Sequence, residues 1–224
     1  MSTFLGASIG RKLIVAVSGL FLILFLAVHL VVNLTLLAGQ ETYNMVAHWM
    51  GTNPAVSVIQ PVLTVGLLVH IGYSAYVSLS NWRARPQPYY WSDPAGGSTW
   101  ASRNMLLLGG LILAFLVLHI SSFSIRVKLG DAPMADIGGV MTKDLYAMVT
   151  ARFELGWYVL TYVVAMFFLG LHLAHGFHSG IQTLGLSDGT WRNRWVLLGT
   201  GYSIVIAAGY MLLPIYFFLR THSG

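Results

Sequence analysis

The chain has 224 residues, of which 56% are hydrophobic and only 8% are charged, and its mean hydropathy is +0.72. Because a soluble domain carries about 25% charged residues, this composition excludes an ordinary water-soluble globule. The lack of cysteine excludes disulfides, cysteine-ligated iron–sulfur clusters and covalent haem attachment. The formal net charge of +5 comes from scattered basic residues, which indicates membrane topology rather than binding to nucleic acid.

Five apolar segments follow one another along the chain. A helix needs roughly 20 apolar residues to cross a bilayer. We therefore predict membrane-spanning helices at residues 13–38, 55–82, 103–126, 155–184 and 195–219. The first apolar run is too long for a cleaved signal peptide, and no cleavage-type motif precedes polar sequence. The expected fold is an all-α integral membrane protein in which residues 1–224 form a single transmembrane domain.

The basic residues near the segment ends predict the orientation. Seven lie on one side of the membrane: Arg11, Lys12, Arg83, Arg85, Arg103, Arg192 and Arg194. Five lie on the other: Arg126, Lys128, Lys143, Arg152 and Arg220. Cytoplasmic loops carry the excess of Lys and Arg, so we place the N-terminus in the cytoplasm and the C-terminus outside. The loop at 85–97, rich in Pro and Gly, fits a docking surface and an ordinary connector equally well.

Four histidines lie well inside the first four segments, one on each: His29, His70, His119 and His172. Ionisable residues within a membrane are costly and usually functional. At about 1.5 Å per residue, His29 and His119 lie roughly 16 Å and 10 Å from the outer polar flank. His70 and His172 lie roughly 25 Å and 27 Å from it on the same scale. Two layers of two histidines are therefore predicted, each joining two parallel helices.

Two imidazoles per layer suit bis-histidine haem ligation, in which both axial positions of the iron are filled. Such a site transfers electrons, and it is built inside helix bundles from facing side chains. Zinc needs three or four ligands in one cluster, which two per layer do not supply. A proton relay would need acidic partners, and no Asp or Glu lies inside a span. The sequence thus favours two b haems enclosed by the first four helices.

The fourth segment offers more than one ligand. His175 and His178 follow His172 at three-residue steps, so both His172 and His175 are candidate ligands of the inner iron. The depth of His172, twelve residues before Leu184, matches that of His70, twelve before Trp82. This match favours His172 and leaves His175 and His178 as candidates for hydrogen bonds to a propionate or a quinone.

The order and spacing of several short motifs resemble the di-haem cytochrome b (b558-type) membrane anchor of succinate:quinone oxidoreductases, the succinate dehydrogenases and fumarate reductases of complex II. The motifs are SGL at 18–20, HLVVN at 29–33, AHWM at 47–50, HIGY at 70–73, the stretch 103–119, and GLHLAHGFHSGIQTLGL at 170–186. The resemblance covers nearly the whole chain, and the last motif is the most specific.

The resemblance implies five helices, the first four of which enclose two haems. Its axial ligands fall on His29 and His119 for the distal haem and on His70 and His172 for the proximal haem. It also implies a flavoprotein subunit with covalent FAD and an iron–sulfur subunit, docked on the cytoplasmic side of a bacterial inner membrane. Electrons from succinate would pass through those partners and the haems to a lipid quinone, for which menaquinone is expected. This chain would then be a non-flavin subunit of the enzyme, with a quinone site in or beside it and no catalytic residue of its own.

Depth and charge suggest further contacts. Arg11, Lys12, Arg103, His175 and His178 are candidates for the haem propionates, which basic groups bind through charge-assisted hydrogen bonds. Ser18 and Arg83, near the inner layer, and Asn33, Tyr43 and His48, near the outer layer, are candidates for quinone contacts.

One feature departs from the family. Some quinol-oxidising fumarate reductases carry a glutamate near the ligand on the fourth helix, whereas this chain has Gly170 there and no acidic residue in that helix after Glu154. The direction of the reaction and a higher oligomer of the complex are left open. Alternative functions are a cytochrome b subunit of another membrane oxidoreductase, such as a hydrogenase or a formate dehydrogenase, and a haem-free transporter.

Overall fold

The computed structural model describes residues 8–84 and 99–223 of the chain. Within these ranges, five helical segments are long and apolar enough to cross a membrane: Ile9–Ala38, Pro54–Arg83, Met105–Leu129, Gly156–Thr183 and Arg192–His222. The prediction of five spans in a multi-pass membrane protein is confirmed. The predicted loop at 85–97, including Arg85, lies outside the described residues, and Thr99, the short α4 (Trp100–Arg103) and Asn104 precede the third span.

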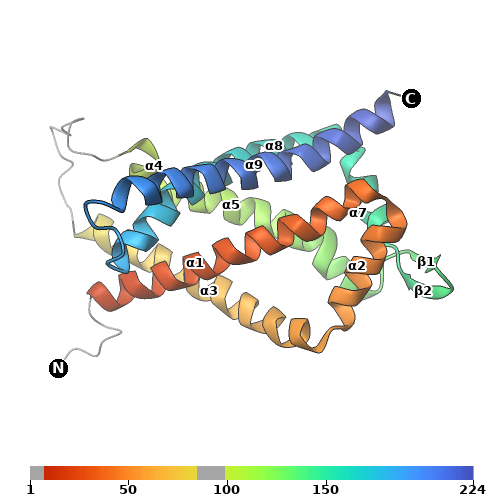
Figure 1. Ribbon diagram of the computed structural model, residues 1–224, viewed down its shortest axis with the longest axis horizontal. Helices are drawn as coiled ribbons and strands as arrows, with labels where there is room; N and C mark the ends of the chain where they lie inside the picture. The colour runs from red at the N-terminus through yellow and green to blue at the C-terminus, as the bar shows by residue number, and fades with distance from the viewer. Residues whose placement is uncertain (1–7, 85–98, 224) are drawn as a thin grey trace.

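The long helices run along one axis, and the described chain begins and finishes at opposite ends of the molecule (Figure 1). The helix α8 (Gly156–Thr183) packs against α9 (Arg192–His222), α1 (Ser8–Leu34) and α5 (Met105–Ile120). The helix α3 (Pro54–Arg83) packs mainly on α1. None of the residues of α3 is fully buried, although this helix carries His70.

The third span is not a uniform α-helix. A π-helical turn, Ser121–Ile125, follows the last residue of α5, begins two residues after His119 and leads into α6 (Arg126–Leu129). Single π-turns inside membrane helices widen the backbone by one residue and are frequent at functional sites. The turn here changes the rotation of the chain within two residues of a predicted haem ligand.

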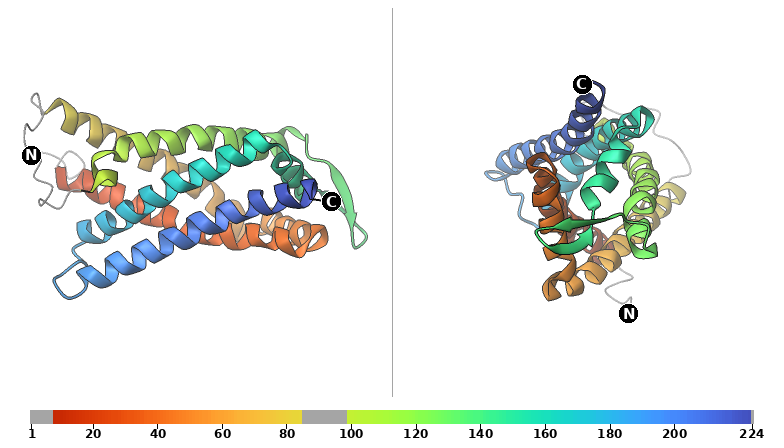
Figure 2. Two further views of the ribbon diagram at one scale, coloured as in Figure 1. Left: turned by 90° about the horizontal axis from the view of Figure 1, so that it is seen from above. Right: turned by 90° about the vertical axis from the view of Figure 1, so that its right-hand side faces the viewer.

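A cap of short elements covers the end of the molecule opposite the N-terminus (Figure 2). It consists of the 3₁₀ turn Thr35–Ala38, α2 (Gln40–Thr52), the hairpin of β1 (Met134–Ile137) and β2 (Val140–Lys143), and α7 (Leu145–Phe153). The hairpin is antiparallel, and its turn uses Gly138 and Gly139 at φ of 62° and 85°. Two positive φ values are what a tight hairpin turn requires. The all-α expectation therefore holds for the membrane part but not for this hairpin, whose two strands are too short to show a pattern in the sequence.

Two buried clusters hold the helices together, and α8 contributes to both. One lies towards the cap and includes Leu36, Tyr43, Phe153, Tyr158 and Tyr162. The other includes Leu30, Met166, Leu169, Leu173 and Ile206. Small residues permit the close approach of α9, as membrane helix interfaces require.

Gly199 of α9 gives a direct test of that approach. A Cβ atom there would lie 2.5 Å from Cδ1 and 3.0 Å from Cγ of Phe177 on α8. We expect Gly199→Ala to reduce the free energy of unfolding by about 1–3 kcal/mol, because an added methyl group in a packed contact forces its neighbours apart. Gly201, in the same helix, has no atom within 4 Å of such a Cβ, so Gly201→Ala is the matched control. Thermal unfolding in detergent should separate the two; equal melting temperatures would contradict the packing described.

Candidate functional site

The outer pair of predicted ligands is brought together. His29 of α1 and His119 of α5 have their ring centroids 6.0 Å apart, with the rings perpendicular. Two imidazoles on opposite sides of one metal ion place their centroids roughly 6 Å apart, given metal–nitrogen bonds of about 2 Å and about 1.1 Å from each nitrogen to its ring centre. The spacing of this pair therefore fits bis-histidine ligation.

Aromatic side chains surround the outer pair and hold its rings in place. Phe25 stacks on His29 at 5.1 Å, and Phe123 lies edge-on to His119 at 5.3 Å. The Tyr162 hydroxyl of α8 is 2.7 Å from Nδ1 of His119. An oriented Nδ1 leaves Nε2 as the ring nitrogen that can face a metal, which is the usual arrangement around metal-bound histidines.

The fifth span fixes α1 next to the outer pair. The hydroxyl of Tyr202 donates to the carbonyl of Ile23, and that of Tyr210 donates to the carbonyl of Leu26 at 2.9 Å. The Tyr210 ring lies 6.0 Å from His29. A helix carbonyl that accepts a second hydrogen bond from a neighbouring helix is anchored in register. The helix α9 thus sets the depth and rotation of the segment that carries His29.

The inner pair lies in one part of the bundle. The side chains of His70 on α3 and His172 on α8 are within range of an electrostatic interaction. The Ser18 hydroxyl of α1 is 3.2 Å from Nδ1 of His70. The Nδ1 atom of His172 is buried and has no hydrogen-bond partner among the described residues. A buried polar atom left without a partner is costly in hydrocarbon surroundings, which indicates that this ring is built to meet a group besides the protein.

Between the two candidate ligands on α8, the geometry favours His172. His175 is half-buried and has His172 and His178 as its ionisable neighbours, whereas it is His172 that interacts with His70. A Cβ at Gly109 of α5 would lie 3.9 Å from Cε1 of His172, so His172 also faces the third span.

For the two predicted haems, we expect His172→Ala to remove the inner one and His175→Ala to leave the haem content unchanged. The reason is that only the ring beside His70 can share an iron with it. Haem bound per polypeptide, measured by pyridine haemochrome, is the readout. Loss of haem from the His175 variant alone would show that His175, about one turn further along α8, is the ligand in place of His172.

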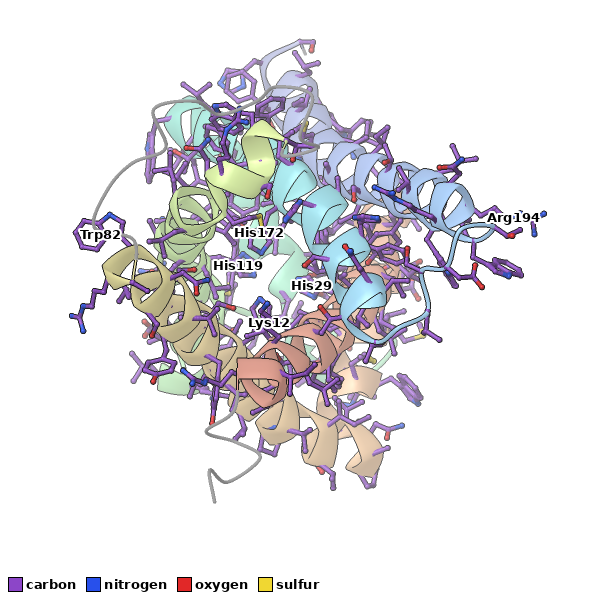
Figure 3. The ribbon with its side chains drawn as sticks, turned by 90° about the vertical axis from the view of Figure 1, so that its left-hand side faces the viewer. Lys12, His29, Trp82, His119, His172 and Arg194 are labelled. Carbon is purple, nitrogen blue, oxygen red and sulfur yellow. The ribbon has the colours of Figure 1, made fainter. Side chains whose placement is uncertain are left out.

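The end of the bundle nearest the N-terminus carries basic groups. Viewed from that end, Lys12 and the labelled histidines lie within the ring of helices, while Trp82 and Arg194 project outwards (Figure 3). Arg11 donates to the Tyr76 hydroxyl at 3.2 Å and lies over the same ring at 5.2 Å. The Nε2 atom of His178 is buried without a partner in the described part of the chain. Arg83 and Arg103 are exposed at the ends of α3 and α4.

The three candidates for an outer quinone contact have separate partners. Asn33 donates from Nδ2 to the carbonyl of His29 in its own helix at 2.7 Å. His48 is exposed and its Nδ1 lies 3.1 Å from the Thr142 hydroxyl of the hairpin. Tyr43 is buried beside Tyr146, and burial raises the pKa of its phenol to about 12. The phenol therefore stays protonated at neutral pH and can donate a hydrogen bond.

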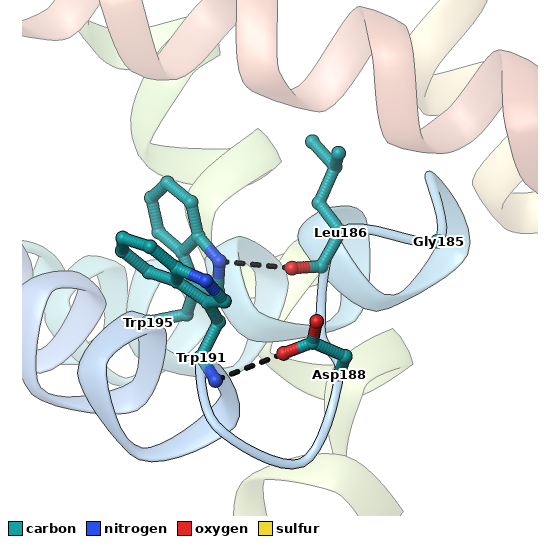
Figure 4. A pocket seen from close by; sticks show the side chains of 5 residues that line it. All are labelled: Gly185, Leu186, Asp188, Trp191 and Trp195. Carbon is teal, nitrogen blue, oxygen red and sulfur yellow. Dashed lines mark hydrogen bonds between the residues drawn. The ribbon is translucent and has the colours of Figure 1, made fainter.

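A surface hollow of about 300 Å³ lies at the turn between α8 and α9 (Figure 4). Its lining consists of Gly185, Leu186, Asp188, Trp191 and Trp195. The indole of Trp195 donates to the carbonyl of Leu186 at 3.0 Å, and Asp188 accepts from the backbone N–H of Trp191 at 3.0 Å. None of the intramembrane histidines lines it. The two tryptophans are placed as interfacial residues are, and the hollow is a feature of that turn.

Several contacts around the site were not predicted from the sequence, namely those of Tyr162, Tyr210, Tyr76 and Gly19. Each joins residues at least 43 positions apart, and an isolated Tyr or Gly in an apolar run carries no local signal.

Within residues 8–84 and 99–223, no three side chains of His, Asp or Glu converge as a metal site, so the candidate centres are the two histidine pairs. No protein-family model matches the chain, and comparisons with curated proteins and with solved structures give no match.

Proposed function

We propose that this chain is the di-haem cytochrome b membrane anchor of a succinate:quinone oxidoreductase, in which it passes electrons from an iron–sulfur subunit to a membrane quinone. The observation that carries the proposal is the meeting of four histidines from four membrane helices as two pairs, with one pair at a centroid spacing of 6.0 Å.

The residues present fit two haems. Each pair supplies two neutral nitrogen ligands from different helices, and the buried Nδ1 of His172 has no partner among the described residues. The helix α3 has no fully buried residue, and a bound haem would cover its inner face. When bound, a haem held by two histidines would supply one-electron transfer.

The side chains of the chain itself have three tasks. The paired histidines hold the two centres at two depths, so that together they span part of the membrane. The apolar and aromatic residues around His29 and His119 exclude water from the outer centre. Arg11 and Lys12 lie at the N-terminal end of the bundle, where cationic groups suit the carboxylates of the inner haem.

The partners in this proposal come from the resemblance to complex II anchors, which implies a flavoprotein and an iron–sulfur subunit. The iron–sulfur clusters would belong to those subunits, because this chain has no cysteine to ligate them. The end with Arg11, Lys12, Arg83, Arg103, Arg192 and Arg194 is the proposed cytoplasmic side of a bacterial inner membrane and the docking face for those subunits. The proposed electron acceptor is menaquinone, at a site in or beside this chain.

The first test is a dithionite-reduced minus oxidised spectrum of the purified chain, with haem counted per polypeptide by pyridine haemochrome. Two b haems per chain are expected. One haem would overturn the pairing, and none in a folded preparation supplied with haem would overturn the cytochrome function. Co-purification of succinate dehydrogenase activity then distinguishes complex II from a hydrogenase or a formate dehydrogenase.

A further inference from the structure

Ser18 on α1 is buried, and its hydroxyl has two kinds of neighbour. The oxygen lies 2.6 Å from the carbonyl of Ile14, one turn earlier in the same helix. It also lies 3.2 Å from Nδ1 of His70 on α3. A serine hydroxyl has one hydrogen to donate and two lone pairs with which to accept.

The short contact with Ile14 decides where that hydrogen goes. A carbonyl can only accept, so the Ser18 hydroxyl donates to it, and the remaining contact with His70 must be one in which Ser18 accepts. The Ser18 hydroxyl also lies 3.2 Å from the carbonyl of Val15, which likewise can only accept. Nδ1 of His70 therefore carries the hydrogen, and Nε2 keeps its lone pair. In a neutral imidazole one nitrogen donates and the other accepts, so this hydrogen bond selects the tautomer.

Gly19 sets the position of the same ring. A Cβ atom at Gly19 would lie 3.0 Å from Cε1 and 3.4 Å from Nδ1 of His70. The lack of a side chain lets the imidazole rest on the backbone of α1, within reach of the Ser18 oxygen. Two adjacent residues on one helix therefore control both the orientation and the tautomer of a histidine on another.

We propose that Ser18 and Gly19 are positioning residues for His70, which hold its ring against α1 with Nδ1 protonated and present Nε2 as the ligand of the inner haem iron. The inference rests on the proposed haem function, and it gives Ser18 a role as a partner of the ligand rather than as a quinone contact. A hydrogen bond from Nδ1 raises the basicity of the ligating nitrogen and fixes the plane of the ring.

The two histidines of the inner pair differ in the hydrogen-bond partner of Nδ1. His70 has the Ser18 hydroxyl on its Nδ1, whereas Nδ1 of His172 is without a partner in the described part of the chain. A change at Ser18 therefore acts on the inner centre through His70 alone. The outer centre has its own hydroxyl, that of Tyr162 on His119, and should not respond.

The test uses the full-length, haem-loaded chain with Ser18→Ala. We expect the midpoint potential of the inner haem to rise, because a less basic imidazole stabilises the oxidised iron less, and its low-spin EPR signal to shift. Inner haem should also be lost roughly 10- to 100-fold more readily on dilution or washing, the range typical of lost partners of metal ligands. The potential and EPR signal of the outer haem should stay unchanged. Ser18→Thr keeps the hydroxyl and should restore the wild-type values.

Ser203→Ala is the matched control. Ser203 is a buried serine on α9 whose hydroxyl donates to the carbonyl of Gly199 at 2.6 Å, the same intrahelical bond that Ser18 makes with Ile14. It differs in having no histidine contact among the described residues. Gly19→Ala should reproduce the EPR shift by displacing the ring, while Gly72→Ala, with no atom within 4 Å of its Cβ, should not.

The outcomes separate the two proposals. If the wild-type chain binds no haem, the proposed function fails. If it binds two haems and Ser18→Ala leaves the inner potential, EPR signal and haem retention at wild-type values, the positioning role is wrong and the function stands. Equal effects of Ser18→Ala and Ser203→Ala would show a general packing effect and would also overturn the inference.

Discussion

Replacing His29 with alanine is expected to halve the haem content of the chain, from two per polypeptide to one. A bis-histidine centre has only two protein ligands, and His29 is the only one that α1 supplies to the outer centre. The inner pair lies at another depth and shares no ligand with the outer pair, so its haem should remain. His70→Ala should give the converse loss. Redox titration of the absorbance change should show one component in each variant, with different midpoint potentials in the two.

Two control experiments test whether the loss of haem is caused by the loss of one ligand from one layer. His48→Ala is the matched control, because His48 is an exposed histidine whose ring contacts the Thr142 hydroxyl and no other histidine among the described residues. It should keep both haems. Exogenous imidazole should restore the missing haem to His29→Ala, since the small ligand can replace the lost ring. If the His29 and His70 variants both retained two haems with unchanged spectra, the two-layer arrangement would be wrong.

The second large effect is expected on stability rather than on haem. Asp144 precedes α7 and accepts three hydrogen bonds: from Gln40 Nε2 at 2.7 Å, Asn44 Nδ2 at 2.8 Å and the backbone N–H of Ala147 at 3.0 Å. Asn44 is fully buried and also accepts from the backbone N–H of Tyr146 at 2.9 Å. This network joins α2 to α7 and so holds the cap on the end of the bundle opposite the N-terminus.

We expect Asp144→Ala to lower the free energy of unfolding by about 3–5 kcal/mol. The hydrogen bond from buried Asn44 to the charged carboxylate is worth about 1.5–3 kcal/mol, the bond from exposed Gln40 adds less, and the lost N-cap adds about 1 kcal/mol. The change also leaves the buried amide of Asn44 without its acceptor. For a chain of this size, the melting temperature should fall by roughly 6–20 °C. Thermal unfolding of the detergent-solubilised protein is the measurement.

Asp136 provides the control for Asp144. It lies in the neighbouring hairpin, is exposed, and accepts from the backbone N–H of Gly139 at 2.8 Å. Asp136→Ala should cost no more than about 1 kcal/mol, as exposed positions usually do. Asp144→Asn should fall between the two, because an amide oxygen can replace one of the carboxylate oxygens. A melting temperature of Asp144→Ala equal to that of Asp136→Ala would mean that the network does not hold the cap.

The sequence was sufficient for the spans and for bringing His29 together with His119. Within a membrane each backbone group must be satisfied inside its own segment, so an apolar run of sufficient length forms a helix whatever its neighbours are. The rise of about 1.5 Å per residue then converts position into depth. His29 and His119 were placed in one layer by this measure alone, and their rings lie 6.0 Å apart in the structure.

The tertiary structure decided which groups meet within each layer. Depth along a helix says nothing about its rotation or about which helices are adjacent. Three contacts depend on helix rotation and on which helices are adjacent. They are the hydrogen bond between Tyr162 and His119, the contact of Ser18 with His70, and the hydrogen bond from Tyr210 to α1. The same holds for the cap, where Asp144 meets residues about 100 positions away. Hydropathy and helical rise are local properties of the chain, whereas these contacts arise only when the helices pack. The sequence alone therefore determined the spans and the pairing of His29 with His119, and the packing determined which other groups meet them.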